Sequence, residues 1–525
     1  MRIFSAKLIK LKRIMNLQNF YITKLAKTDS VMCIIRDFLP SNKIVSTEGY
    51  KNSEPPKMNF MKLRINSCYC LTMSIVLVIL FGFVINISAT IITYPAPPGL
   101  TTSPDFAMKV NDTPIWVERI GSKMQSFNYR LYSGREMEDL NVANFSCSGS
   151  LTIKITASKN IESFIIRPKS RGIKAEVKGQ DITFTIPGPQ KLYIEINDLP
   201  HLAIFANPLE VNPPQKGDSR VVYYGPGTHN PEKIELQSNQ TIYIAGGAIV
   251  NANIRGSNLQ NVKIIGRGIL QGTIRISGTS NLEVNGIFIR NTRGWTNTLT
   301  NCHHSSYRNV KVFSYEGIYG LDGINPVSCT NFTIDDCFMR CRDDCVAIKS
   351  RDYNLRVDSI FVTNCVMVGW ACSDGVTIGF ELNGSPVENI LVKNCDILYA
   401  RSGGQTGGHS GFSIVCDGPA WVQNVRYEDI RVEEQVEFKN LEFIVTMGTY
   451  YGDDPPGHIK GVYLKNIQWE NQSKPFILSG FSPNNLVEDI TFDNCKVGDK
   501  ILTNTSDAHF MISGYVRNIK FIPSE

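Results

Sequence analysis

One short pattern of alternating apolar and polar residues recurs through the C-terminal half of the chain. It appears as NVKIIG, NLEVNG, NVKVFS, NFTIDDC, SIFVTNC, NILVKNC, NVRYED, GVYLKN, DITFDNC and NIKFI. Counted from Ile242 to Ile519, the steps between successive runs are 20, 20, 28, 22, 28, 30, 35, 37, 28 and 29 residues. Runs rich in β-branched residues that end in Asn or Cys and repeat at irregular steps are typical of a parallel β-helix with turns of unequal length. We therefore predict an all-β solenoid over residues 215–525.

A second pattern precedes the solenoid. Residues 91–212 contain alternating runs such as SLTIKITAS, DITFTIP and QKLYIEIN, separated by Gly, Pro, Asn and Ser. This spacing predicts an antiparallel β-sandwich. Pro213 and Pro214 mark the linker between the two domains. Because the first turn of a solenoid needs cover, we expect the sandwich to act as a cap, with a carbohydrate-binding role as the alternative.

The N-terminal region differs from both domains. Residues 1–66 hold thirteen Lys or Arg against four Asp or Glu and read as a basic, unstructured extension. Residues 67–89 are uncharged and include a continuous apolar run, which suits a signal peptide if translation begins at Met58 or Met61. If Met1 is the start, residues 71–87 become a signal anchor. We expect a secreted protein, with membrane anchoring as the alternative; eight N-x-S/T sequons are compatible with either.

Charge excludes one class of partner. The net charge of +6 comes from the basic extension, and residues 67–525 sum to −3. We therefore expect no nucleic acid ligand. The oligomeric state is left open by the sequence.

Three carboxylates stand out within the solenoid. Asp322 is followed twenty-one residues later by the pair Asp343 and Asp344. Since stacked strands lie about 4.8 Å apart, Asp322 should lie one turn below the pair, with carboxyl groups on the order of 5 to 10 Å apart, the range over which two carboxyl groups can act on one glycosidic bond. An Asp-Asp dipeptide is usually only a polar turn. Here a strand follows at once, so both side chains can serve one site only if the backbone bends there.

The same residues carry a family resemblance. DGINP, from Asp322 to Pro326, and RDDCVAIKS, from Arg342 to Ser350, resemble the (N)TDG(I/F)DP and DDC(I/V)A(I/V)(K/N)SG segments of glycoside hydrolase family 28, the polygalacturonase group. That resemblance implies a right-handed parallel β-helix and an inverting glycoside hydrolase. It makes Asp343 the general acid, with Asp322 and Asp344 holding and deprotonating the water. The N-terminal sandwich is similar to that of dextranase-type enzymes in the same β-helix superfamily.

Some positions depart from the family. Asp374, in SDGVTIG, stands where the family has histidine, and GFSIVCD, from Gly411 to Asp417, replaces the RIK segment associated with a uronate carboxylate. Both departures argue against polygalacturonate as the substrate. The resemblance also makes Lys349 a match to a lysine of exo-acting members. We treat it as a substrate-binding candidate, together with four residues near the carboxylates: Asp374, His409, Trp295 and Trp370. Exposed tryptophans beside the carboxylates would stack on sugar rings.

Fourteen cysteines raise the question of metal or disulfide bonds. Several fall at strand ends of consecutive turns, among them Cys337, Cys365 and Cys395, and no C-x-x-C pair occurs in this region. We expect no metal site and no cofactor. Stacked buried thiols and one or two disulfides are the predicted arrangements.

Three functional alternatives remain beside a polygalacturonase-like hydrolase acting on a polysaccharide or oligosaccharide. A dextranase-type hydrolase of neutral glucan suits the sandwich and the missing uronate segment. A non-catalytic glycan-binding β-helix is favoured mildly by Asp374. A polysaccharide lyase would need calcium and a basic residue, and Arg342 and Lys349 flank the carboxylates.

Overall fold

The structure is a computed structural model that describes residues 89–121, 139–290, 292, 294–314, 320–370, 373–401, 410–436, 438–448 and 455–523. The predicted extension 1–66, the apolar segment 67–89 except its last residue, and His409 lie outside these ranges. Within them, no helix has the length and apolar character needed to cross a membrane.

The N-terminal part is a sandwich of two β-sheets. The seven-stranded sheet runs β2-β5-β6-β12-β11-β8, with β1 paired to β6, and the five-stranded sheet runs β4-β3-β7-β10-β9. All pairs are antiparallel except the parallel pair β6–β12. The strands are β1 (Thr90–Thr93), β2 (Thr101–Thr102), β3 (Phe106–Val110), β4 (Thr113–Ile115), β5 (Val117–Ile120), β6 (Leu140–Ser148), β7 (Leu151–Ala157), β8 (Phe164–Arg167), β9 (Ala175–Lys178), β10 (Asp181–Ile186), β11 (Gln190–Ile196) and β12 (Leu202–Pro208); a 3₁₀ helix, η2 (Lys169–Arg171), follows β8.

Alternation along these strands builds the sandwich core. In β7 every second residue is buried, from Leu151 to Ala157, and the polar residues between them face outward. Strands of this kind bury one face against the opposite sheet. The resulting core contains Phe106, Phe145, Ile155 and Phe184 from both sheets.

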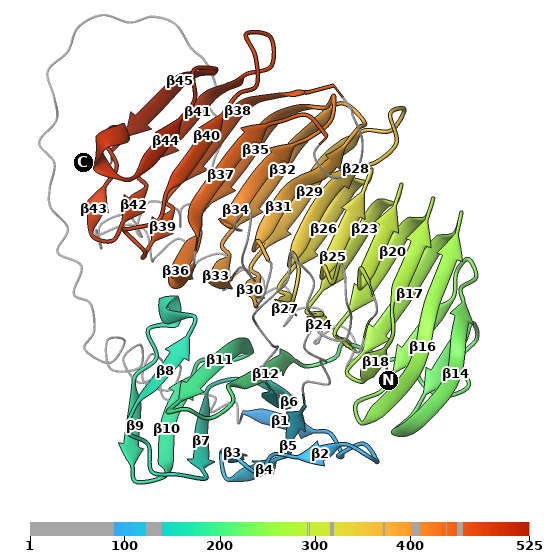
Figure 1. Cartoon of the computed structure of the whole chain (residues 1–525). Coiled ribbons are helices and arrows are strands. Elements are labelled where there is room, and N and C mark those ends of the chain that lie inside the picture. Colours follow the sequence, from blue (N-terminus) through green and yellow to red (C-terminus); the bar gives the residue numbers. More distant parts are fainter. Residues whose placement is uncertain are drawn as a thin grey trace, which may run out of the picture. The chain divides into compact units, whose positions relative to one another are not determined.

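The C-terminal part is the predicted parallel β-helix, whose strands stack in chain order in Figure 1. Twelve strands form one parallel sheet: β13 (Val221–Tyr224), β15 (Thr241–Ile244), β17 (Gln260–Gly266), β20 (Ser280–Asn285), β23 (His303–Arg308), β26 (Thr330–Asp335), β29 (Val357–Thr363), β32 (Val387–Lys393), β35 (Trp421–Glu428), β38 (His458–Lys465), β41 (Val487–Asp493) and β45 (Val516–Ile522). Nine of the ten recurring sequence runs occupy these strands. The run NVKVFS, residues 309–314, lies instead on β24 (Lys311–Ser314) of the other sheet, so the expectation that it forms the same strand of its turn is wrong; β23 takes that place.

The other sheet divides after β16 into two parallel ladders, so a typical turn contributes three strands. Both start from β14 (Gly227–Glu235) and β16 (Ala248–Ser257). One ladder, here called the sandwich-side ladder, contains β18 (Ile269–Gln271), β21 (Phe288–Arg290), β24 (Lys311–Ser314), β27 (Phe338–Cys341), β30 (Val366–Gly369), β33 (Asp396–Ala400), β36 (Arg431–Val436), β39 (Gln468–Trp469) and β42 (Lys496–Val497), and β43 (Lys500–Ile501) pairs with its last strand. The other, here called the carboxylate ladder, contains β19 (Ile274–Ser277), β22 (Asn297–Thr300), β25 (Ile324–Val327), β28 (Val346–Ser350), β31 (Val376–Leu382), β34 (Ser410–Cys416), β37 (Lys439–Val445), β40 (Phe476–Ser479) and β44 (Phe510–Ile512); a 3₁₀ helix, η3 (Thr505–Asp507), precedes its last strand.

Polar side chains also stack from turn to turn at the edges of the coil. Asn364 and Asn394 both have positive φ angles, which Asn tolerates better than most residues. Asn394 Nδ2 donates to Asn364 Oδ1 at 2.7 Å, and Asn364 Nδ2 donates to Asp335 Oδ1 at 2.7 Å. These side-chain ladders hold successive turns in register.

The cysteines form a ladder of buried thiols. All ten described cysteines are free and buried, including Cys337, Cys365 and Cys395 on consecutive turns. Cys365 Sγ donates to the carbonyl oxygen of Thr363 at 3.1 Å. The predicted stacking of thiols is thus present, whereas the predicted disulfides are wrong for the described cysteines, because their sulfur atoms fill the core as small apolar groups.

The sandwich packs along the side of the coil. Phe205 and Tyr193 of the seven-stranded sheet share a hydrophobic cluster with Phe288, Phe313 and Phe338, which belong to three successive strands of the sandwich-side ladder. The sandwich therefore covers apolar residues over several turns of the coil, and its role as a cap on the first turn stays a prediction.

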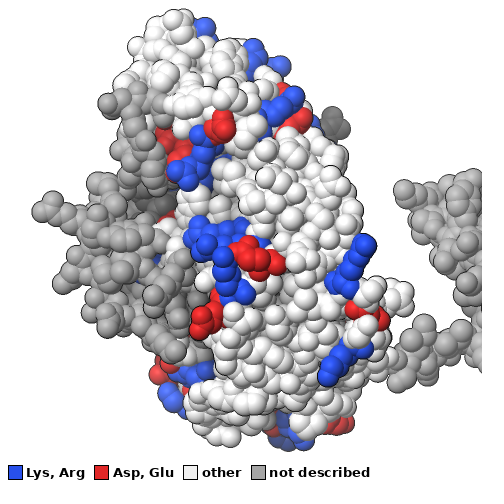
Figure 2. Space-filling model, turned by 90° about the vertical axis from the view of Figure 1, so that its right-hand side faces the viewer, with Lys and Arg blue, Asp and Glu red and all other residues white. Residues whose placement is uncertain are grey.

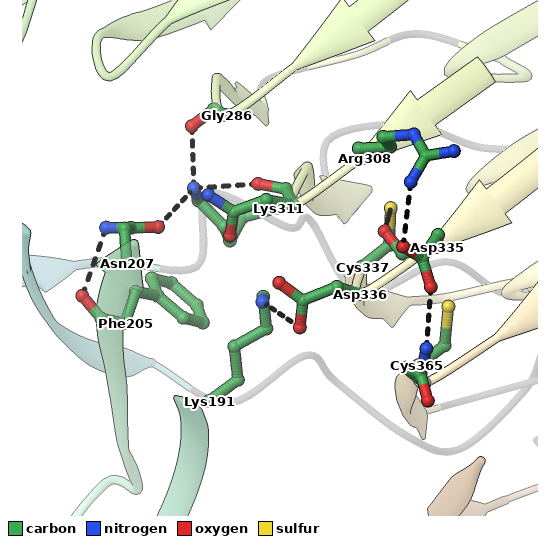
Figure 3. A network of polar contacts seen from close by, with 12 residues as sticks. Lys191, Phe205, Asn207, Gly286, Arg308, Lys311, Asp335, Asp336, Cys337 and Cys365 are labelled. Atoms are coloured by element: carbon green, nitrogen blue, oxygen red, sulfur yellow. Dashed lines mark hydrogen bonds and ion pairs between the residues drawn. The ribbon is translucent and has the colours of Figure 1, made fainter. Parts of the chain in front are cut away.

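Polar contacts reinforce this packing, as Figure 3 shows for Lys311. Its buried ammonium group donates to Asn207 Oδ1 at 2.8 Å, to the Gly286 carbonyl at 2.6 Å and to the Asn309 carbonyl at 3.0 Å. Burial, with smaller contributions from nearby cations, holds the pKa of Lys311 well below its ordinary value. The lysine therefore acts as a hydrogen-bond donor that joins the sandwich to the coil.

An ion-pair cluster joins the two parts at a second point. The buried Arg167 pairs with Glu195 at 2.5 Å, with Glu434 at 2.8 Å and with Glu433. Burial raises the pKa of Glu433 to about 7, against the lowering effect of Arg167. On the face drawn in Figure 2, basic side chains lie mostly beside acidic ones in small groups, with wide uncharged areas between them.

Candidate active site

Three aspartates occupy the same register position on successive turns of the carboxylate ladder. Asp322, Asp344 and Asp374 each lie two residues before the first paired residue of β25, β28 and β31. The backbone bonds support this stacking: Gly323 N donates to the Asp344 carbonyl at 2.8 Å, and Cys345 N donates to the Asp374 carbonyl at 3.0 Å. Asp322 and Asp344 therefore lie one turn apart, as the sequence predicted.

Asp343 lies next to the stacked aspartates, at a bend of the backbone directly before Asp344. The backbone bends at Arg342 and Asp343, as the sequence required, and the strand resumes at Val346. Asp343 is half-buried, whereas Asp322 and Asp344 are buried. Asp343 Oδ1 accepts the backbone N–H of Asp344 at 3.0 Å. The bend thus leaves Asp343 as the most accessible of the three predicted catalytic carboxylates.

Each buried carboxylate has a defined donor. Asp322 Oδ2 accepts a hydrogen bond from Asn325 Nδ2 at 2.7 Å, and Asp344 Oδ1 accepts the backbone N–H of Asp374 at 2.9 Å. A bond from the next turn therefore fixes the orientation of Asp344.

The environment of Asp322 favours its protonated form. Burial and the negative charge of Asp343 raise the pKa of Asp322 to about 7, and Lys349 opposes this effect. Two close carboxyl groups in a buried site tend to share a proton, so one can act as an acid while the other acts as a base. This is the electrostatic arrangement that glycoside hydrolysis requires.

Asp374, at the position of the family histidine, makes several hydrogen bonds within the coil. Asp374 Oδ1 accepts the backbone N–H of Ser410 at 2.6 Å, and Ser413 Oγ donates to Oδ2. Both serines belong to β34, one turn further along. Asp374 is 4% exposed. Its carboxylate therefore holds two turns together beside the catalytic candidates.

Lys349 lies at the far end of β28 in a group of charged and aromatic side chains. Lys349 Nζ is 3.4 Å from Glu381 Oε2, and Arg351 Nε is 3.5 Å from Glu381 Oε1. The Lys349 ammonium lies 4.9 Å from the ring centre of Trp295, and the Arg351 guanidinium lies 5.7 Å from it. Lys349 also lowers the pKa of Asp322 electrostatically. The structure thus brings together Asp322, Lys349 and Trp295, as the sequence suggested.

Two acidic groups here had no predicted role. Glu381 is buried, and the backbone N–H groups of Glu381 and Leu382 donate to Asp417 Oδ1 at 2.7 and 3.2 Å. Burial raises the pKa of Asp417. In the sequence, the signal for Glu381 is a charged residue inside the apolar run VTIGFEL. A glutamate that is buried in such a strand requires a polar or charged partner.

Trp370 corrects another prediction. Its side chain is fully buried and packs against His201 and Tyr399, with the guanidinium groups of Arg340 and Arg401 at 4.4 and 4.2 Å from the ring centre. The ring has no exposed face on which a sugar could stack. Trp370 contributes instead to the packing between sandwich and coil. His409 lies outside the described residues.

Among the described residues, we find no group of three or more His, Cys, Asp or Glu side chains that could hold a metal ion.

Comparisons with known proteins agree with the fold. The model of glycosyl hydrolases family 28 matches residues 228–499, a stretch that includes the carboxylates. A probable polygalacturonase of Vitis vinifera is 24% identical over 196 residues, covering 36% of this chain and 31% of the relative. A putative rhamnogalacturonase D of Aspergillus niger is 28% identical over 155 residues, covering 29% of each chain. The chain thus spans less than a third of the length of these curated relatives.

A solved structure extends the similarity to the whole fold. Dex49A from Penicillium minioluteum superposes with a TM-score of 0.55 at 14% identity, covering 82% of this chain and 96% of that one. At this identity the likeness concerns the fold alone. The family match spans more than half of the 525 residues and contains the three stacked turns that carry the aspartates, so the chain belongs to glycosyl hydrolases family 28.

Proposed function

We propose that this protein is an inverting glycoside hydrolase that cleaves a polysaccharide. The observation that carries the proposal is the group of Asp322, Asp343 and Asp344 at one edge of two stacked turns, with burial and mutual repulsion raising the pKa of Asp322 to about 7. Family membership and relatives described as polygalacturonases support hydrolysis of a glycosidic bond.

In this mechanism Asp343 is the general acid. It is the half-buried member of the group, so it can reach the glycosidic oxygen and transfer its proton as the bond to the anomeric carbon breaks. The leaving sugar then departs as a neutral alcohol. Asp322 and Asp343 repel each other when both are ionised, so the pair retains one proton. When Asp343 carries this proton it can donate it to the glycosidic oxygen, and Asp322 is then ionised and available as a base.

Asp344 and Asp322 are the proposed base. A water molecule held between their carboxylates attacks the anomeric carbon from the opposite face, and its proton passes to one of them. The bond from the Asp374 N–H orients Asp344, and the bond from Asn325 orients Asp322. Because the water attacks opposite the leaving group, the anomeric configuration is inverted.

The test is product release by the full chain from polygalacturonate, rhamnogalacturonan, dextran and arabinan, with and without EDTA. Asp343→Asn removes the acid, and Asp358→Asn, on β29 of the twelve-stranded sheet, is the matched control. We expect reducing ends from one polymer with the parent protein and the control, a loss of at least about 10²-fold in Asp343→Asn, and no effect of EDTA.

Two results would contradict hydrolysis with Asp343 as the acid. One is activity of Asp343→Asn equal to that of the control. The other is an unsaturated product whose formation EDTA abolishes, which would indicate a lyase. Proton NMR of the first product gives the anomeric configuration, and retention of configuration would exclude the assigned mechanism.

A further inference from the structure

The outer face of the carboxylate ladder continues past the carboxylates as a row of polar side chains. Ile324, Val346 and Ile348 point into the core of the coil. Residues that alternate with them face outward, and these include Asn325 and Lys349. Asn325 is bonded to Asp322, so the row begins at the proposed catalytic group and reaches Lys349 on the next turn.

The cations in this row are already paired. Glu381 lies between Lys349 and Arg351, with one carboxylate oxygen 3.4 Å from the lysine nitrogen and the other 3.5 Å from the arginine Nε. The side chains of Lys349 and Glu381 are 4% and 5% exposed. In such a site an ion pair is screened little by water, so Glu381 cancels most of the positive potential of Lys349. The side chain of Arg351 is 58% exposed, and solvent screens its charge as well.

Two acceptor atoms in the row make no hydrogen bond to any described residue. Asn325 Oδ1 is buried without a contact of this kind, and Glu381 Oε2 has only the ion-pair contact with Lys349 Nζ at 3.4 Å. Leaving a buried acceptor unbonded is unfavourable. A donor brought by a ligand would satisfy both atoms. Sugar hydroxyl groups are such donors, whereas an ionised carboxylate can only accept.

Further negative charge surrounds the same place. Asp322 is affected electrostatically by both Asp343 and Glu381, and Asp417 lies against the backbone of Glu381. A uronate here would add a carboxylate to this group of acidic side chains, and the two nearest cations are engaged by Glu381. The cost of bringing like charges together in a buried site is substantial.

We propose that Glu381 is a specificity-determining residue: it occupies Lys349 and Arg351, so that the subsite between Asp322 and Trp295 accepts a neutral sugar whose hydroxyl groups donate to Asn325 Oδ1 and Glu381 Oε2. This inference rests on the proposed function for the location of the subsite and narrows its substrate class to neutral sugar units. Trp295 supplies the aromatic surface beside the ring.

The test measures binding, so it does not depend on turnover. The Asp343→Asn full chain is titrated by calorimetry with neutral oligosaccharides prepared from dextran, arabinan and fully methyl-esterified polygalacturonate, and with ionised hexagalacturonate. The titrations are repeated with Glu381→Gln added. The matched control is Glu388→Gln. Glu388 lies on β32 of the twelve-stranded sheet and forms an ion pair with Arg356.

We expect at least one neutral oligosaccharide to bind more tightly than hexagalacturonate. Glu381→Gln should weaken that neutral ligand about tenfold, through loss of a charged acceptor, and strengthen hexagalacturonate about fivefold, because Lys349 and Arg351 are released. Glu388→Gln should change neither. If Glu381→Gln does not fold, Arg351→Gln at an exposed position serves instead. Because Glu381 already engages this arginine, the affinity for hexagalacturonate should change less than about twofold, and a larger loss would show that Arg351 holds the uronate and would overturn the proposal.

Tightest binding of hexagalacturonate by the parent, or weaker hexagalacturonate binding in Glu381→Gln, overturns the proposal, as does binding of none of the ligands. Failure of this proposal can be distinguished from failure of the proposed function. Neutral binding that depends on Glu381 in a protein without hydrolytic activity would refute the hydrolase and leave the specificity of the subsite intact.

Discussion

Replacing Asp322 by Asn should stabilise the protein, and more so at alkaline pH. The pKa of Asp322 rises from its ordinary value of 3.8 to about 7 on folding. The folded state therefore binds more protons than the unfolded state between about pH 4 and pH 7, and the free energy of unfolding falls as pH rises through this window. Each factor of ten in the ionisation equilibrium corresponds to about 1.4 kcal/mol.

The size of the effect on the free energy of unfolding follows from the difference between the two pKa values of Asp322. Keeping Asp322 in its buried position costs under about 2 kcal/mol at pH 5 and about 4 kcal/mol at pH 8, where it is ionised in both states. An asparagine has no charge to desolvate and keeps an oxygen for the bond from Asn325. Asp322→Asn should therefore raise the free energy of unfolding by roughly 2 to 3 kcal/mol more at pH 8 than at pH 5.

Urea unfolding of both proteins at the two pH values, followed by tryptophan fluorescence, measures this difference. Glu433, whose pKa is also raised to about 7, is present in both proteins and cancels. Asp198→Asn is the control, since Asp198 is exposed and Lys159 lowers its pKa; it should give no gain at pH 8. Equal effects of Asp322→Asn at both pH values, or a loss at pH 8, would refute the argument that Asp322 is held in the fold at an energetic cost.

Three further predictions concern the pH dependence of hydrolysis, the Arg167 ion pairs and the thiols. Hydrolysis by the parent protein should decline above about pH 7, because Asp322 and Asp343 lose the proton they share; a pH profile of kcat/KM that stays flat to pH 9 would contradict this. Arg167→Met should destabilise the protein by about 3 to 5 kcal/mol, because it leaves Glu433 buried without its cation, and the matched variant Arg356→Met, at an exposed pair, should cost less than about 1 kcal/mol in the same urea assay. Dithiothreitol should leave Tm unchanged if the ten described cysteines are free thiols in solution as they are in the structure; a drop of several degrees would reveal a disulfide.

The coil and its aspartates could be predicted because their signals are local or repeat along the chain. The runs of β-branched residues mark strands, and strands one turn apart carry Asp322 and Asp344 to equivalent positions. The bend at Asp343 followed from alternation alone. None of this needed knowledge of contacts between distant segments.

What could not be predicted depends on such contacts. Trp370 has the sequence context of a loop aromatic beside the site, and only the docking of His201, 169 positions earlier, shows that its ring is buried. Glu381 is one charged residue in an apolar run, and its role follows from the side chains of Lys349 and Arg351 on the preceding turn. Pairings of this kind are set by packing, which the pattern of one strand does not encode.

The equal register of Asp322, Asp344 and Asp374 on three turns bears on how such a protein can change during evolution. Turn length varies outside the strands, from 20 to 37 residues between successive runs, while the paired positions keep their separation of one strand. Insertions between strands can therefore reshape the walls around the site without displacing the carboxylates. A substitution at the shared position alters one point along a bound chain and leaves its neighbours in place, so new specificities can be acquired one turn at a time.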